Sequence, residues 1–245
     1  MAVLRICNKE VAMIHNTYTG RTCLVFGANS FFGRTVSEHF SRNAVNLGLI
    51  DLDSRRNDTL AQTMRKSDCQ VLYRAVPHGD EDAFTKAVEN ISTQLGNIDY
   101  LICSYYLEDM RNEIDQRDLS IATWERMFDE WIRSYFLILK AVVPGMIRNK
   151  GGKVVFMNTT IGYTGEGEGE GGLAGEGSIH ESACSSALTG MMTSIARDII
   201  PQGISVNGIA LGPDYEQDID RILWAAHLWL SGMGDYSCAQ ILRLY

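Results

Sequence analysis

Short apolar, β-rich runs alternate with longer helical patterns along the chain, and this alternation constrains the fold more than any other feature. The expected strands are residues 22–26, 46–51, 69–73, 100–103, 153–158, 204–209 and 239–243. The clearest helical patterns cover residues 80–95, 123–148 and 181–200. Such alternation is typical of a parallel sheet with helices on both faces. We therefore predict a doubly wound, Rossmann-type α/β sandwich with about seven strands.

The alternation continues without a boundary or repeat, so we expect a single domain over residues 1–245. Residues 1–20 are interpreted as an N-terminal extension, and a Gly/Glu-rich stretch at 164–177 as an insertion. The chain has 30 acidic and 22 basic residues, which gives a net charge of −8. Nucleic-acid binding requires clustered Lys and Arg, so this charge balance argues against that class of partner.

The first twenty residues have no apolar core of the kind found in signal peptides, which predicts a cytoplasmic protein. The longest strongly apolar run, at 222–230, is too short for a membrane span. The six cysteines are scattered and form no Cys-x-x-Cys pair. This spacing indicates reduced thiols and no metal site.

A glycine-rich turn, GANSFFG at 27–33, follows the first expected strand, and Asp51 ends the second. Five later segments stand in a matching order: GNIDYLICSYY, TWERMFDEWIRSYFLILKAVVPGM, GGKVVFMNTTIG, SACSSALTGMMTSIARDI and GISVNGIALGP. With these segments the chain resembles the classical short-chain dehydrogenase/reductase family from residue 20 onward. The resemblance implies a Rossmann fold and ancestry among NAD(P)-dependent alcohol dehydrogenases.

The cofactor motif of that family is altered here. Phe31 replaces the middle glycine of Thr-Gly-x-x-x-Gly-x-Gly, where a side chain would stand in the path of the pyrophosphate. Gly27 and Gly33 are kept, and Asp51 stands where an acid would bind the adenosine ribose of NAD. We interpret these three residues as vestigial and blocked by Phe31. This chain is thus expected to bind no cofactor, with NAD held by a partner subunit.

The resemblance also locates four altered catalytic positions. Glu181 replaces the family's Tyr and Ser185 its Lys, while Thr159 replaces its Ser and Trp131 its Asn. Because Tyr and Lys carry the family's proton transfer, we predict no catalytic residue in this chain and no enzyme activity on its own. The short run between Pro213 and the last expected helix further indicates that the family's substrate lid is missing.

The favoured hypothesis is therefore a non-catalytic subunit that assembles with an active paralogue through the helices at 123–148 and 181–200. Trp131, Tyr135 and Phe136 are its candidate contacts. This pattern also resembles the inactive chains of heteromeric short-chain dehydrogenases that oxidise 2-(hydroxybenzyl)succinyl-CoA in anaerobic toluene degradation.

Two alternative functions stay open. One is an active oxidoreductase with relocated groups, either Glu181 with His180 or Tyr163. The other is an NAD(H)-sensing regulatory protein. Four glutamates in the 164–177 insertion would repel phosphates near the site.

Overall fold

The computed structural model describes residues 18–53, 59–64, 69–105, 120–161, 179–212 and 219–244. Seven parallel strands form one sheet in the order β3-β2-β1-β4-β5-β6-β7. The strands are β1 Thr22–Phe26, β2 Asn46–Leu52, β3 Val71–Val76, β4 Ile98–Cys103, β5 Gly152–Thr159, β6 Ile204–Leu211 and β7 Ile241–Leu244. The predicted doubly wound α/β fold is therefore confirmed. The order of strands reverses at β1, so the connections that leave the carboxyl ends of β1 and β4 run in opposite directions along the sheet.

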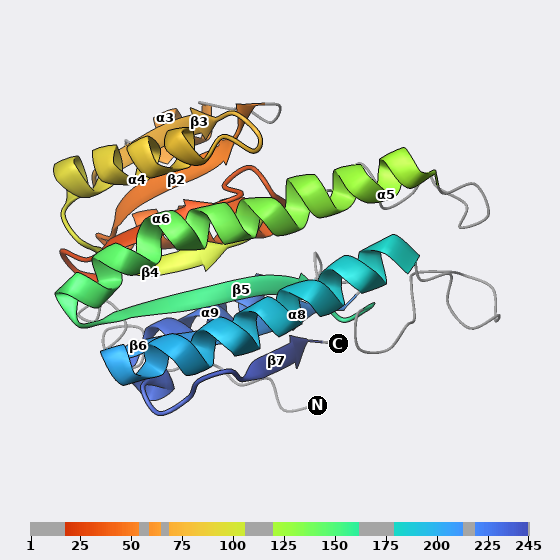
Figure 1. Cartoon of the computed structure of the whole chain (residues 1–245). Helices are drawn as coiled ribbons and strands as arrows, with labels where there is room; N and C mark the ends of the chain where they lie inside the picture. The colour runs from red at the N-terminus through yellow and green to blue at the C-terminus, as the bar shows by residue number, and fades with distance from the viewer. Residues whose placement is uncertain are drawn as a thin grey trace.

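Helices cover both faces of this sheet (Figure 1). One core packs α4 (Glu81–Leu95), α6 (Ser134–Asn149) and α8 (Ile179–Ile199) against the sheet. The second core packs α2 (Phe31–Ser41), α3 (Thr59–Met64) and α9 (Ile219–Leu230) on the opposite face. The central strands are therefore buried on both faces, which explains why β1 is apolar and buried throughout.

The helix expected at 123–148 is divided into three parts. It comprises α5 (Ile121–Met127), a π-helical segment at Phe128–Arg133 and α6. Pro144 lies inside α6 without ending it. Such π segments commonly mark functional sites, and this one contains Trp131.

Part of the predicted N-terminal extension belongs to the core. Tyr18 is fully buried, and its hydroxyl lies 3.0 Å from Nδ1 of His227 on α9. Nε2 of the same histidine lies 2.7 Å from Nε2 of His39 on α2. This chain of hydrogen bonds joins three segments that are distant in sequence.

Among the described helices, none is both long and apolar enough to cross a membrane. Cys23, Cys69, Cys103, Cys184 and Cys238 are free thiols, and the first four are buried.

Candidate active site

The glycine-rich turn joins β1 to α2 at the carboxyl edge of the sheet. Gly27 has φ +79°, and a Cβ there would lie 2.2 Å from the backbone nitrogen of Tyr105. A Cβ on Gly33 would lie 2.2 Å from the carbonyl oxygen of Gly27. Both positions thus require glycine for the turn itself and for packing the start of α2 against it. Ser30 caps this helix, because its Oγ accepts a hydrogen bond from Gly33 N at 3.0 Å.

Asp51 lies beside this turn, near the end of β2. Its carboxylate accepts hydrogen bonds from the backbone nitrogens of Asn29, at 2.7 Å, and of Leu52, at 2.9 Å. The side chain is fully buried. These two bonds fix the carboxylate between the glycine-rich turn and the end of β2. The structure therefore brings Asp51, Gly27 and the start of α2 together, as a dinucleotide site requires.

Aromatic side chains around the turn pack into the protein core. Phe31 is half-buried and contacts the core that contains α2 and α9. The ring of Phe26 stacks on that of Tyr105 with centroids 5.4 Å apart, inside the opposite core.

The end of β5 and the side of α8 form a compact group of hydrogen bonds. Ser185 Oγ donates to the carbonyl oxygen of Thr159 at 3.0 Å. The side chain of Asn158 donates to the carbonyl oxygen of Ser185 at 2.8 Å and accepts from Thr159 N at 2.9 Å. These bonds hold α8 in a fixed position against the carboxyl end of β5.

One hydroxyl beside this group is not satisfied by it. Thr159 Oγ1 is buried and has no hydrogen-bond partner among the described residues. Glu181 precedes Ser185 by four residues, so the two side chains lie on the same face of α8. Glu181 is 8% exposed, which places a mostly buried carboxyl group on the helix face that packs against Thr159. His180 is also buried, and its pairing with Glu181 stays a prediction.

Trp131 and Tyr135 lie on the inner side of the π segment and α6. Both are 1% exposed or less, so they pack within the monomer and not at an interface. The Tyr135 hydroxyl lies 2.9 Å from the carbonyl oxygen of Cys103 and 3.1 Å from that of Met157, which links β4 to β5. Burial raises the pKa of Tyr135 well above its ordinary value, so its hydroxyl stays protonated and keeps donating.

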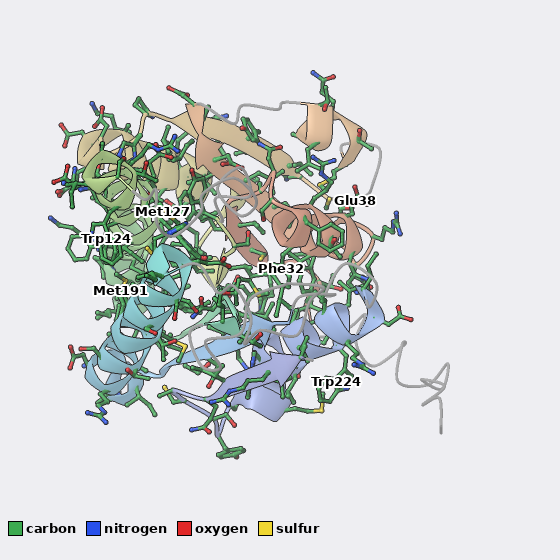
Figure 2. The ribbon with its side chains drawn as sticks, turned by 90° about the vertical axis from the view of Figure 1, so that its right-hand side faces the viewer. Phe32, Glu38, Trp124, Met127, Met191 and Trp224 are labelled. Atoms are coloured by element: carbon green, nitrogen blue, oxygen red, sulfur yellow. The ribbon has the colours of Figure 1, made fainter. Side chains whose placement is uncertain are left out.

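A groove of about 930 Å³ runs between α5, the π segment and α8. Trp124 from α5 and Met191 from α8 lie on this face of the molecule (Figure 2). Phe136 also lines the groove and is 53% exposed, unlike Trp131 and Tyr135. Of the three aromatics predicted as contacts, only Phe136 thus lies on the surface.

Asn158 was not predicted from the sequence, because no motif marks an amide side chain at the end of β5. Its position directly before Thr159 was the only available signal. Tyr163 and the 164–177 insertion lie outside the described residues. The connection that was predicted to lack the family's lid runs from the end of β6 at Leu211 to the start of α9 at Ile219.

A family model described as short chain dehydrogenase matches residues 21–215. The 3-oxoacyl-[acyl-carrier-protein] reductase FabG of Aquifex aeolicus is 23% identical over 210 residues, covering 83% of this chain and 77% of that protein. Short chain dehydrogenase MYCFIDRAFT_6125 of Pseudocercospora fijiensis is 27% identical over 143 residues, 58% of this chain, but the match spans only 46% of its length. A solved 3-oxoacyl-[acyl-carrier protein] reductase with bound NAD from Brucella melitensis shares the fold at TM-score 0.79 and 18% identity, covering 100% of this chain and 96% of that one.

These findings correct two expectations. The prediction that the chain is not an enzyme is wrong, because the matched family and its relatives are reductases and dehydrogenases. The error was to infer a loss of catalysis from the replacement of the family's Tyr and Lys. Glu181, which stands at the Tyr position, also carries an acidic group. The prediction that no cofactor is bound is wrong as well, because the same fold holds NAD in the Brucella reductase. Phe31 was given too much weight: it has core contacts, and the turn around it keeps its geometry.

Proposed function

Because this chain belongs to the short-chain dehydrogenase family, we propose that it is an NAD(H)-dependent oxidoreductase acting on an alcohol or the corresponding carbonyl compound. The observation that carries the proposal is the unpartnered hydroxyl of Thr159 beside the helix face of Glu181. A buried hydroxyl without a protein partner costs free energy unless a ligand satisfies it. A substrate oxygen is the ligand that this family would place there.

The residues around the glycine-rich turn fit a dinucleotide. The N-terminus of α2 favours the pyrophosphate, because its first backbone N–H groups point out of the helix. Asp51 would accept hydrogen bonds from ribose hydroxyls and would repel a 2′-phosphate, which favours NAD(H) over NADP(H). When bound, NADH supplies the hydride for reduction of a carbonyl carbon.

Thr159 and Glu181 then have separate tasks. The Thr159 hydroxyl donates a hydrogen bond to the carbonyl oxygen and orients it. The carboxyl group of Glu181 would deliver a proton to that oxygen, which together with hydride from bound NADH would convert the carbonyl compound to an alcohol. In the oxidation direction, the Glu181 carboxylate takes the proton back.

The cofactor proposal predicts that the chain binds NADH and that Asp51→Asn weakens this binding about tenfold, a free-energy change of about 1.4 kcal/mol. Asn keeps one acceptor oxygen for the turn but loses the charge, so the preference for NADH over NADPH should shrink. Calorimetric titration with both dinucleotides measures this. The matched control is Asp53→Asn, an exposed position two residues further on. Equal NADH affinity in all three proteins would refute the role of Asp51.

We also propose that the chain assembles with another short-chain dehydrogenase chain through α5, α6 and α8. The exposed Phe136 and the groove beside it support this proposal. Large aromatics carry much of the binding energy of interfaces. The resemblance to chains of the 2-(hydroxybenzyl)succinyl-CoA dehydrogenase favours a paralogue as the partner.

Phe136→Glu is expected to convert the assembly to monomers, because it places a charge in an apolar contact. Sedimentation analysis of the chain, alone and co-expressed with a paralogue, measures the change. Ile147→Glu serves as control, since Ile147 is 37% exposed on the same helix but does not line the groove. An unchanged oligomeric state for Phe136→Glu, or dissociation by both variants, would contradict the proposed surface.

A further inference from the structure

The sheet opens between β4 and β5 just before the candidate active site. The last paired residues of these two strands are Cys103 and Phe156, whereas β5 stays paired with β6 as far as Thr159 and Leu211. Thr160 N bonds to the carbonyl oxygen of Leu211 on β6. Successive residues of a strand direct their backbone groups to opposite sides, so those of Thr159 face the opening. Buried backbone groups there need partners other than a strand.

Two buried side chains supply these partners. Asn158 Oδ1 accepts from Thr159 N at 2.9 Å, and Ser185 Oγ on α8 donates to the carbonyl oxygen of Thr159 at 3.0 Å. The amide nitrogen of Asn158 also donates to the carbonyl oxygen of Ser185 at 2.8 Å and to Thr189 Oγ1 at 3.2 Å. One amide side chain thus bonds the backbone of Thr159 and two successive turns of α8.

These bonds bear on Glu181, which lies one helical turn before Ser185, about 6 Å along the axis of α8. A hydrogen-bonded helix is stiff over such a distance, so bonds at Ser185 and Thr189 fix both its separation from β5 and its rotation. Separation and rotation together determine how far the Glu181 carboxyl group lies from the Thr159 hydroxyl.

We propose that Asn158 is a positioning residue, which holds the Glu181 carboxyl group where its proton can reach a substrate oxygen bound to Thr159. This inference rests on the function proposed above for Glu181 and Thr159. Asn158 acts on the reaction through α8 and not by contact with the substrate. Displacement of a reacting group by about 1 Å can lower a rate about 10²-fold, so the loss of these bonds affects turnover as well as stability.

Asn158→Ala is expected to lower the turnover number about 10- to 100-fold, while the Kd for NADH stays within about twofold. Turnover is measured as NADH oxidation with an aldehyde or ketone that the wild type reduces, well below the melting temperature of each variant. Asn158→Asp keeps an acceptor for Thr159 N but has no amide proton for Ser185. It should show the same loss of turnover, and it replaces Asn158→Ala in the test if that variant does not fold.

Combining Asn158→Ala with Glu181→Gln separates positioning from a general loss of structure. Once residue 181 delivers no proton, its exact position matters little, so Asn158→Ala should lower the remaining turnover only about twofold. A purely structural effect would lower turnover by the same factor with Glu181 and with Gln at that position.

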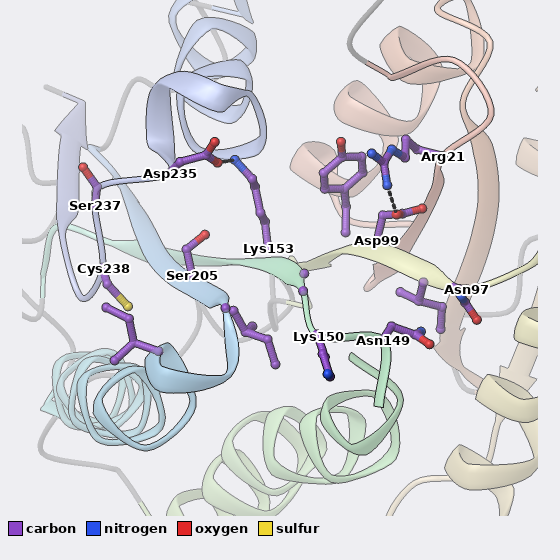
Figure 3. Close-up of a pocket in the computed structure, with 17 residues that line it drawn as sticks. Arg21, Asn97, Asp99, Asn149, Lys150, Lys153, Ser205, Asp235, Ser237 and Cys238 are labelled. Atoms are coloured by element: carbon purple, nitrogen blue, oxygen red, sulfur yellow. Dashed lines mark hydrogen bonds and ion pairs between the residues drawn. The ribbon is translucent and has the colours of Figure 1, made fainter. Parts of the chain in front are cut away.

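The matched control is Asn207→Ala on β6. Asn207 is also buried, and its amide also forms two hydrogen bonds, to the carbonyl oxygen of Ser237 at 2.9 Å and from Gln240 N at 3.0 Å. Ser237 lines a polar cavity at the amino ends of the strands, where Lys153 pairs with Asp235 (Figure 3). This is the edge of the sheet opposite the candidate site. Asn207→Ala should therefore lower the melting temperature about as much as Asn158→Ala but leave turnover unchanged.

Three results would overturn the positioning role. They are wild-type turnover in Asn158→Ala or Asn158→Asp, equal losses of turnover in Asn158→Ala and Asn207→Ala, and the same factor for Asn158→Ala with and without Glu181. A wild-type chain that reduces no carbonyl compound with NADH would refute the proposed function itself, and this inference with it.

Discussion

Replacing Glu181 by glutamine is expected to lower the turnover number about 10² to 10⁴-fold, the usual contribution of a general acid–base group. Glutamine has nearly the same shape and still forms hydrogen bonds, but its amide delivers no proton. Because Glu181 lies on α8 and not at the turn that holds the dinucleotide, the Kd for NADH should stay within about twofold. NADH oxidation with a panel of aldehydes, ketones and 3-oxoacyl thioesters measures turnover, and calorimetry measures the Kd.

Two further variants separate proton transfer from a structural effect. Glu89→Gln makes the same change at an exposed position on α4 and should have no effect. Thr159→Val removes the orienting hydroxyl and should also lower turnover, while Thr159→Ser should restore most of it. Full activity in Glu181→Gln would remove Glu181 from the mechanism, and normal turnover in Thr159→Val would leave the buried hydroxyl without a catalytic task.

The second large effect is a loss of stability in acid that depends on the His39–His227 pair. The pKa of His227 is lowered from 6.5 to about 4, first because burial disfavours a charged ring and second because His39 lies beside it. Burial, together with Arg42, also lowers the pKa of His39. The remaining partner is the Tyr18 hydroxyl, whose pKa burial raises, so it stays neutral. A second proton on the pair would place two positive rings against each other.

The direction of the pH dependence follows from proton counting. Between pH 6.5 and 4 the unfolded chain binds a proton at His227 that the folded chain does not bind. Stability is therefore complete above pH 6.5 and falls as the pH decreases through this window, by about 3 kcal/mol for His227 alone.

Urea unfolding between pH 7 and 4 measures this loss. In His227→Gln the part that depends on residue 227 should disappear, so the stability of the variant should fall less steeply than that of the wild type. His39→Gln is the companion variant: it removes the neighbouring ring but not the burial, and should flatten the curve only in part. Parallel pH curves for the wild type and His227→Gln would show that the pair does not control acid stability.

Much of the candidate site could be predicted from the sequence. The positions of Gly27, Gly33 and Asp51 follow from local order along the chain, since a strand, a tight turn and a helix are neighbours in sequence. The same holds for Thr159 and Glu181, which were located by their register with family segments. Alignment with the family segments could not decide whether a position with a changed residue type had lost its function. The wrong expectation that the chain is not an enzyme came from assuming that it had.

The sequence by itself determined the parallel α/β sheet, the order of its elements and the end of the sheet where the site lies. These features follow from periodicity, which is a local property of the chain. Only the tertiary structure decided which side chains meet: Asn158 with Ser185, Tyr18 with His227, and Lys153 with Asp235. These groupings depend on how helices pack against the sheet, and no local pattern encodes that packing. For the same reason Trp131 and Phe136, on adjoining helical segments, were alike in sequence, but packing buried one and left the other exposed.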